Sequence, residues 1–301
     1  MLVDEQKDRR NNYIALGSFD GLHKGHLELV EKVVSLAGEN KGKSIIYTFK
    51  NHPRTVLQPD FKSDILMDNK SKEEILKKFN VDLVYFEDFN KSFMEKSPEE
   101  FIKYIVKKFN LKGIVAGFNY KFGYKNIGDV SLLKELGEKY GFKVFVIEPC
   151  KYKEIVISST RIRQELRKGH VEEAKNMLTR PYFLRGKVAH GKEIGRTICF
   201  PTANLERDSK LLLPEEGVYY TNVIWNNNIY KAITSIGSNP TVNGKKITVE
   251  SHILDFNENI YEDEIKVQFI KKIRNNVKFN SLEELKEQLN RDKIFAEKEK
   301  F

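Results

Sequence analysis

The stretch GSFDGLHKGH, from Gly17 to His26, places three glycines, an aspartate and two histidines within ten residues. It follows the apolar run 13–16 and precedes apolar residues at helical spacing, so we expect it to join a strand to a helix. His23 and His26 would share one face of the first helical turn, where imidazole groups and the positive end of the helix dipole favour an anion. This arrangement suits charge that develops on a phosphate under attack, and it contains no obvious nucleophile. It therefore predicts direct transfer between two bound substrates.

The glycines of this stretch support a phosphate site. Gly17 and Gly21 would let the backbone approach a phosphate closely, and Gly25 would keep the first helical turn open. A helix cap or a satisfied core residue is the usual role of a lone histidine, but the preceding strand and the flanking glycines disfavour it here. The segment 38–44, GENKGKS, is one residue short of a Walker A loop and precedes a strand, so we discard it as a phosphate site.

A second dense stretch, HGKEIGRTICFPTANL, runs from residue 190 to 205. Gly191 and Gly195 lie among basic residues and would form a flexible loop able to wrap a polyphosphate. The hydroxyl of Thr202 and the amide oxygen of Asn204 suit a hard cation such as Mg²⁺. An ordinary proline turn with a capping side chain is the alternative for this tetrapeptide.

Glu250 lies within VESHILDF, residues 249–256, where most other residues are apolar or aromatic. Alternation places Glu250 and His252 on one face of the expected strand, and Val249 and Ser251 on the other. A carboxylate inside a small barrel is costly unless it is used or paired, so Glu250 is a candidate functional residue. A surface glutamate on a half-exposed strand is the alternative.

The pattern of predicted secondary structure that positions these residues differs between the two parts of the chain. Up to residue 149, short β-rich runs alternate with amphipathic stretches, which predicts a parallel sheet covered on both faces by helices. A further helical pattern, 160–178, follows the last strand, with Ser159 or Thr160 as the expected N-cap. Besides 13–16, the predicted strands are 45–49, 81–86, 113–117 and 143–147, and the predicted helices are 72–79, 98–109 and 130–140.

After Pro181, strand-like runs separated by turns predict a small antiparallel β-barrel. A helix ends the chain, with Ser281 and Glu284 forming a capping box. We therefore expect an α/β protein of two domains, residues 1–179 and 180–301. The predicted barrel strands are 182–188, 217–225, 229–236, 247–256 and 265–273.

The amino-acid composition is that of a globular protein and gives no sign of a membrane helix or a signal segment. The 301 residues are 40% hydrophobic and 32% charged, a globular balance, and no window approaches the roughly 18 apolar residues of a membrane helix. The charged stretch 1–12 has no apolar signal segment, and Cys150 and Cys199 match no metal or redox spacing, so we expect a cytoplasmic protein. The net charge of +9 comes from scattered lysines. This predicts a basic surface that tolerates anionic ligands, and no recognisable nucleic-acid-binding motif is present. We expect no nucleic-acid or membrane partner, and a monomer or weak homo-oligomer.

GSFDGLHKGH resembles the HxGH signature of the nucleotidyltransferase superfamily. Together with TFKNHPRTVL (48–57), GFNYKFG (117–123) and ISSTRIR (157–163), it is similar to the motifs of prokaryotic bifunctional riboflavin kinase/FMN adenylyltransferases, also called FAD synthetases. The stretch at 190–205, GVYYTNV, IGSNPTVNG and VESHILDF resemble the riboflavin kinase half of that family. The resemblance covers roughly residues 13–295 and implies a Rossmann-like nucleotidyltransferase domain followed by a riboflavin kinase-like barrel with a C-terminal helix.

The resemblance implies two reactions that both need Mg²⁺. The barrel would phosphorylate riboflavin with ATP to give FMN, and the N-terminal domain would adenylylate FMN with a second ATP to give FAD and pyrophosphate. In the first domain, His23 and His26 would contact the ATP phosphates, and Ser159, Thr160 and Arg163 would close on the triphosphate.

The kinase roles also follow from the resemblance. Glu250 would be the general base that takes a proton from the riboflavin 5′-hydroxyl, and Thr202 and Asn204 would hold Mg²⁺ and the nucleotide phosphates. The other residues that we expect to bind nucleotide or flavin are Gly17, Phe19, Asp20, Gly25, Asn119, Gly191, Gly195 and Arg274.

Three positions depart from the family pattern, all in the kinase half. Cys199 stands where a glycine is usual, Asn276 replaces an acid in the RxExKF pattern, and Glu262 follows Tyr261 where a glycine is common. These departures leave open an enzyme with one active domain. A flavin or nucleotide sensor that binds without turnover is a second alternative, against which the retained histidines, Arg163 and Glu250 argue.

Overall fold

The computed structural model describes residues 11–51, 56, 64–190, 200–241 and 244–299. The chain divides into two compact units, Met1–Ser159 and Thr160–Phe301, which are described separately below.

The first unit contains a five-stranded sheet in the order β3-β2-β1-β4-β5. Every neighbouring pair in it is parallel. From β1 the chain adds β2 and β3 on one side and then returns to add β4 and β5 on the other. The carboxyl ends of β1 and β4 therefore flank the switch point, where ligands bind in open α/β sheets. The strands are β1 (Asn12–Leu16), β2 (Ser44–Phe49), β3 (Leu83–Glu87), β4 (Leu111–Gly117) and β5 (Lys143–Ile147).

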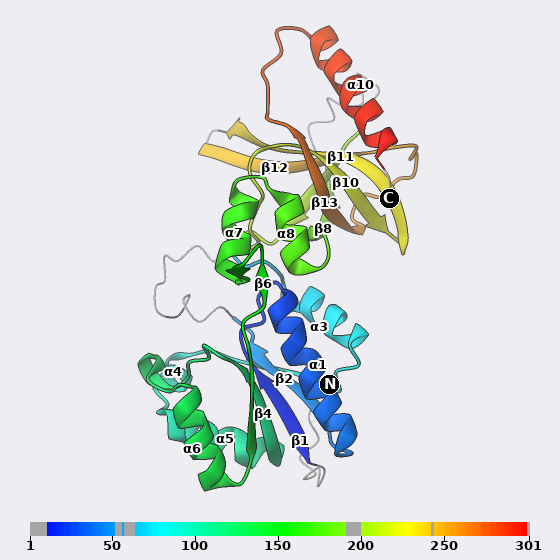
Figure 1. The fold of residues 1–301 in the computed structure, drawn as a ribbon. Helices are drawn as coiled ribbons and strands as arrows, with labels where there is room; N and C mark the ends of the chain where they lie inside the picture. The colour runs from blue at the N-terminus through cyan, green and yellow to red at the C-terminus, as the bar shows by residue number, and fades with distance from the viewer. Residues whose placement is uncertain (1–10, 52–55, 57–63, 191–199, 242–243, 300–301) are drawn as a thin grey trace. The chain divides into compact units, whose positions relative to one another are not determined.

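Helices cover both faces of this sheet (Figure 1). α1 (Lys24–Glu39) contacts β1, β2 and β4. On the other face, α5 (Pro98–Phe109) and α6 (Val130–Tyr140) bury apolar side chains against the same strands in one core. α5 begins with a reciprocal capping box between Ser97 and Glu100. The shorter helices are α3 (Asn69–Lys78), α4 (Lys91–Met94) and the 3₁₀ turn η1 (Tyr124–Asn126).

Two features of the region after β5 differ from the sequence prediction. A short hairpin of β6 (Lys151–Tyr152) and β7 (Ile155–Val156) was not predicted. The single helix predicted over 160–178 is wrong, because the chain forms α7 (Ser159–Arg167) and α8 (Val171–Leu178). Gly169 between them has a φ of +75°, in the left-handed region that ends helices.

The second unit is built around a closed antiparallel barrel in the order β10-β11-β12-β9-β8-β13. Inside it, the hydroxyl of Thr234 lies 2.7 Å from that of Thr221 and 2.8 Å from that of Ser251, and all three side chains are buried. β9 was missed by the sequence prediction. The strands are β8 (Tyr182–Ala189), β9 (Ala203–Arg207), β10 (Gly217–Trp225), β11 (Asn228–Thr241), β12 (Gly244–Ile253) and β13 (Glu264–Arg274).

α10 (Leu282–Lys298) packs on the outside of this barrel (Figure 1). Ala296 of the helix is buried in a cluster with Val218 and Tyr220 of β10. Ser281 caps the helix at the Glu284 N–H, as predicted, but the Glu284 carboxylate accepts its hydrogen bond from the Asn280 N–H. In a regular capping box the Glu284 carboxylate would accept from the Ser281 N–H, so the second hydrogen bond is shifted by one residue toward the N-terminus.

The observed architecture confirms the predicted fold class, a parallel α/β unit followed by an antiparallel barrel with a C-terminal helix. The compact units meet at residues 159 and 160, which assigns α8 and all of α7 except Ser159 to the second unit. The functional boundary at 179–180 stays a prediction. Across the described ranges, none of the helices combines the length and apolar character that a membrane crossing needs.

Candidate active sites

The connection from β1 to α1 is a tightly turned loop at the carboxyl edge of the sheet. Phe19, Gly21 and Leu22 have φ angles of +49°, +81° and +43°. Glycine adopts this left-handed conformation easily, whereas the other two residues are held there with fully buried side chains. The loop delivers the chain to α1, whose first helical residue is Lys24.

His23 and His26 lie together at the start of α1, as their spacing predicts. His23 is the N-cap, and its Nδ1 accepts a hydrogen bond from the His26 N–H at 3.3 Å. This bond requires an unprotonated Nδ1, so a neutral His23 carries its proton on Nε2 and can donate it. The two rings stack with centroids 3.7 Å apart. The pair therefore forms one imidazole surface beside the N–H groups of the first helical turn, which favour an anion.

Two of the predicted glycines lie next to aromatic rings of this loop. A Cβ added at Gly17 would come within 3.2 Å of the Phe19 ring, and one added at Gly25 would lie 3.5 Å from the His23 ring. Cys150, which follows β5, borders the same turn and donates to Glu28 Oε1 at 2.9 Å. Burial raises the pKa of the Cys150 thiol to about 11, so the residue is a weak nucleophile at neutral pH.

Asp20 and Ser159 are brought together, although they come from separate motifs. The Ser159 hydroxyl donates to the Asp20 carbonyl at 2.9 Å, and Asp20 Oδ1 accepts from the Leu66 N–H at 2.9 Å. The buried Asp20 thus ties the loop to two distant segments of the first unit. Its predicted nucleotide contact stays a prediction.

Asn119 follows β4, next to β1 in the sheet, and is exposed. The topology therefore places it at the same edge as the histidine loop, as a ligand-binding role requires. Thr160 and Arg163 lie on α7 in the second unit, so their closing on the triphosphate stays a prediction. The segment 52–55 of the second motif lies outside the described residues.

Lys72 of α3 is a residue of the first site that the sequence reasoning missed. It is buried, and its Nζ donates to the Ser18 carbonyl at 2.9 Å and to Thr48 Oγ1 at 3.3 Å. Lys72 lies four residues before the buried Leu76 and therefore on the buried face of the helix. A charged residue at this spacing is a signal that can be found in the sequence.

In the second unit, strand register places the candidate kinase residues side by side. Glu250 of β12 is paired with Asn204 of β9 on one side and with Ser235 of β11 on the other. Directly paired residues share a face of the sheet. The neighbouring pair, Ser251 with Ala203, is buried and faces the interior. The Glu250 carboxylate is therefore half-buried on the outer face and not inside the barrel, which corrects that part of the sequence argument.

Glu250 and His252 both have partners on this outer face. Glu250 Oε1 accepts a hydrogen bond from the Thr248 hydroxyl at 3.1 Å. His252 Nδ1 lies 2.8 Å from the Pro201 carbonyl, and burial lowers the pKa of His252. Because Pro201 directly precedes Thr202, this contact anchors the start of the predicted metal-binding segment beside β12.

The polar atoms on this face fit a hard cation. Asn204 and Glu250, paired across the strands, offer an amide oxygen and a carboxylate, and Thr202, which directly precedes β9, carries a hydroxyl; these are oxygen ligands that Mg²⁺ prefers. Within the described residues, no group of three histidine, cysteine or acidic side chains has the arrangement of a metal centre. A site with a single carboxylate would be completed by the phosphates of a nucleotide.

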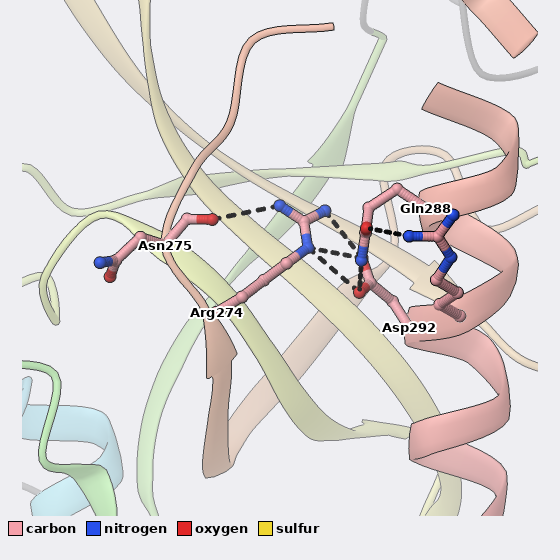
Figure 2. A network of polar contacts seen from close by, with 5 residues as sticks. Arg274, Asn275, Gln288 and Asp292 are labelled. Carbon is pink, nitrogen blue, oxygen red and sulfur yellow. Dashed lines mark hydrogen bonds and ion pairs between the residues drawn. The ribbon is translucent and has the colours of Figure 1, made fainter. Parts of the chain in front are cut away.

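Arg274 ends β13 and is held by α10 (Figure 2). Its Nη2 lies 2.8 Å from Asp292 Oδ2, its Nε lies 3.1 Å from both carboxylate oxygens, and its Nη1 donates to the Asn275 carbonyl at 3.1 Å. Gln288 donates to the same carboxylate at 2.9 Å. The described contacts of Arg274 are thus internal to the unit, and its predicted nucleotide contact stays a prediction.

Two of the three departures from the family pattern are described by the structure. The Asn276 amide donates to the Ile236 carbonyl at 2.8 Å, a bond that an ionised acid could not donate. Glu262 has a φ of +65°, the conformation that suits the glycine of the family pattern. The third, Cys199, lies outside the described residues with Gly191 and Gly195.

Comparison with known proteins follows this division of the chain. The FAD synthetase family model matches residues 5–161, and the riboflavin kinase model matches residues 178–299. The chain belongs to the bifunctional riboflavin kinase/FMN adenylyltransferase family. This membership confirms the predicted function, a riboflavin kinase and FMN adenylyltransferase, and its substrates and products riboflavin, FMN, ATP and FAD.

Relatives in this family match over almost their whole length. The bifunctional riboflavin kinase/FMN adenylyltransferase of Buchnera aphidicola (from Schizaphis graminum) is 36% identical over 95% of this chain and 93% of its own. That of Bacillus subtilis is 33% identical over 96% of this chain and 92% of its own. A crystal structure from Streptococcus pneumoniae titled a macrolide-efflux protein has a TM-score of 0.90 and 34% identity, covering 97% of this chain and 95% of that one. The last similarity confirms the fold.

Proposed function

We propose that residues 1–179 carry the FMN adenylyltransferase activity and residues 180–301 the riboflavin kinase activity, each at the site described above. The observation that carries this division is that separate family models match separate parts of the chain, and that each part holds its own cluster of polar residues. Most of α7 and most of α8 fall between the two matched ranges. The barrel makes FMN from riboflavin and ATP, and the sheet unit makes FAD and pyrophosphate from FMN and a second ATP.

In the adenylyltransferase site, the residues bind and stabilise phosphate without forming a covalent intermediate. The α1 N-terminus and the stacked pair of His23 and His26 offer N–H donors to the ATP phosphates. Their hydrogen bonds become stronger as negative charge develops in the transition state. Asn119 binds the nucleotide or flavin phosphate from the neighbouring strand end. Ser159, Thr160 and Arg163 close on the triphosphate, for which a guanidinium fork is well suited.

In the kinase site, Glu250 accepts the proton of the riboflavin 5′-hydroxyl as the oxygen attacks the γ-phosphate. The Thr248 hydroxyl orients this carboxylate by donating to Oε1. Asn204, paired with Glu250 across the strands, and Thr202 hold Mg²⁺ and the nucleotide phosphates. When bound, Mg²⁺ supplies shielding of phosphate charge.

The localisation, oligomeric state and partners of the enzyme are also proposals. We propose a cytoplasmic enzyme that acts as a monomer or weak homo-oligomer on small molecules, without a nucleic-acid or membrane partner. The lysines that give the net charge of +9 are scattered along the sequence and no recognisable nucleic-acid-binding motif is present, which supports the absence of a nucleic-acid partner.

Glu250→Gln tests the kinase assignment, because it keeps shape and removes basicity. General-base assistance is worth roughly 10²–10⁴ in rate, so we expect phosphorylation at least about a hundredfold slower. Riboflavin and ATP should still bind, and FAD should form from added FMN at the unmutated rate. Separation of FMN and FAD by chromatography measures both steps. A kinase rate within about threefold of the parent would make Glu250 structural.

A further inference from the structure

A buried lysine lies beneath the loop that carries the two histidines. Lys72, in the first turn of α3, is 5% exposed, whereas lysines are almost never fully buried unless paired. Taking an ammonium group out of water costs free energy, and well-packed apolar residues often stabilise such a position as well or better. A charge placed here therefore calls for a role other than fold stability.

The hydrogen-bond partners of Lys72 are neutral groups of the loop and of β2. Nζ donates to the Ser18 carbonyl and to the Thr48 hydroxyl. The charges of Asp20 and Asp68 attract the ammonium group, and their carboxylates accept hydrogen bonds from the Leu66 N–H and from the N–H and hydroxyl of Ser71. Burial outweighs the attraction of these two carboxylates and lowers the pKa of Lys72 to about 8.

The Ser18 carbonyl is held by two donors at once. Lys72 Nζ and Thr48 Oγ1 each lie 2.9 Å from it. This carbonyl belongs to the peptide that precedes Phe19, whose φ of +49° is unfavourable for a residue with a side chain. Flipping this peptide would return Phe19 to a negative φ and turn the carbonyl away from both donors. The two hydrogen bonds therefore hold the peptide in the orientation that the strained conformation requires.

Phe19 transmits this orientation to the histidines. Its ring centroid lies 5.3 Å from that of His26, and His26 stacks on His23. We propose that Lys72 is a positioning residue for FMN adenylylation, whose ammonium group fixes the Ser18–Phe19 peptide so that the Phe19 ring holds His26 in its working place. The inference rests on the proposed role of the two histidines.

Lys72→Met tests this role, since methionine keeps an unbranched apolar side chain and removes the donor and the charge. Misplacing a transition-state donor by about an ångström costs up to roughly 10² in rate. We therefore expect kcat for FAD synthesis from FMN to fall about 10- to 100-fold, with KM values within about threefold of the parent. The riboflavin kinase rate of the same protein should be unchanged. Lys77→Met is the matched control, because Lys77 lies on the same helix with its side chain 69% exposed.

Two further measurements separate positioning from folding. The folded fraction of Lys72→Met, measured by chemical denaturation, should equal that of the parent while kcat falls. Thr48→Val removes the other donor to the Ser18 carbonyl and should lower kcat in the same direction. A loss of activity in proportion to the unfolded fraction would overturn the proposal.

His26→Ala, assayed in parallel, distinguishes this inference from the function on which it rests. If His26→Ala loses FAD synthesis and folded Lys72→Met keeps kcat within about twofold of the parent, the role of Lys72 is wrong and the site stands. If both variants make FAD normally, the assignment of the histidine site is itself wrong.

Discussion

Asp292→Asn should destabilise the second unit strongly, because Asp292 is the buried partner of Arg274. The Asp292 side chain is 1% exposed and that of Arg274 18%. The carboxylate accepts from Arg274 Nε and Nη2 and from Gln288, and asparagine would turn an N–H₂ donor toward donors that already occupy the site. Removing one member of a buried ion pair costs about 3–5 kcal/mol. Because Arg274 keeps some exposure and its bond to the Asn275 carbonyl, we expect about 2–3 kcal/mol.

Denaturant unfolding of the full chain, followed through the sole tryptophan, Trp225 of β10, measures this loss in the second unit. Lys293→Gln is the matched control, because it breaks an exposed pair with Glu297 on the same helix and should cost less than about 0.5 kcal/mol. The double variant Arg274→Met/Asp292→Leu should recover most of the lost stability. A loss for Asp292→Asn no greater than that of the control would refute the reasoning.

The remaining predictions concern two residues whose conformation or burial is unfavourable. Glu262→Gly should raise the free energy of unfolding by about 0.5–1 kcal/mol, because the φ of +65° at Glu262 costs more than the exposed 3.9 Å ion pair of Glu262 with Lys187 contributes. A variant less stable than the parent in thermal unfolding would contradict this. The pKa of Lys72 is about 8 in the folded protein and 10.5 in the unfolded chain. Below pH 8 the buried charge therefore destabilises the fold by up to about 3 kcal/mol, and this penalty disappears as the pH rises from 8 to 10.5. The stability gained by Lys72→Met should therefore shrink over that pH range in denaturation curves, and a constant difference would contradict the shifted pKa.

Local signals predicted most of the fold and the proximity of the two histidines. Helical spacing after an apolar strand located His23 and His26, and the structure joins them by a hydrogen bond and a ring stack. The break at Gly169 was missed because the apolar pattern continues through it. β9 was missed because five residues after a proline turn carry little alternation, and its place is set by pairing with β8 and β12.

Other features depend on contacts between distant segments. The register that pairs Glu250 with Asn204 joins residues 46 positions apart, and neither local pattern contains it. The outward position of Glu250 likewise follows from which face of β12 the barrel encloses. The role of Lys72 needed the position of the Ser18 carbonyl, which the sequence of α3 alone does not contain.

The central claim, that residues 1–179 carry one activity and residues 180–301 the other, is tested most directly by mixing two variants. His26→Ala should convert riboflavin to FMN and stop, because it loses a transition-state donor worth about 10²–10³ in rate. Glu250→Gln should make little FMN from riboflavin but convert added FMN to FAD. An equal mixture supplied with riboflavin, ATP and Mg²⁺ should therefore make FAD far faster than the two variants assayed separately. A mixture that makes no more FAD than the sum of the separate reactions, or a variant that loses both activities while folded, would contradict the account.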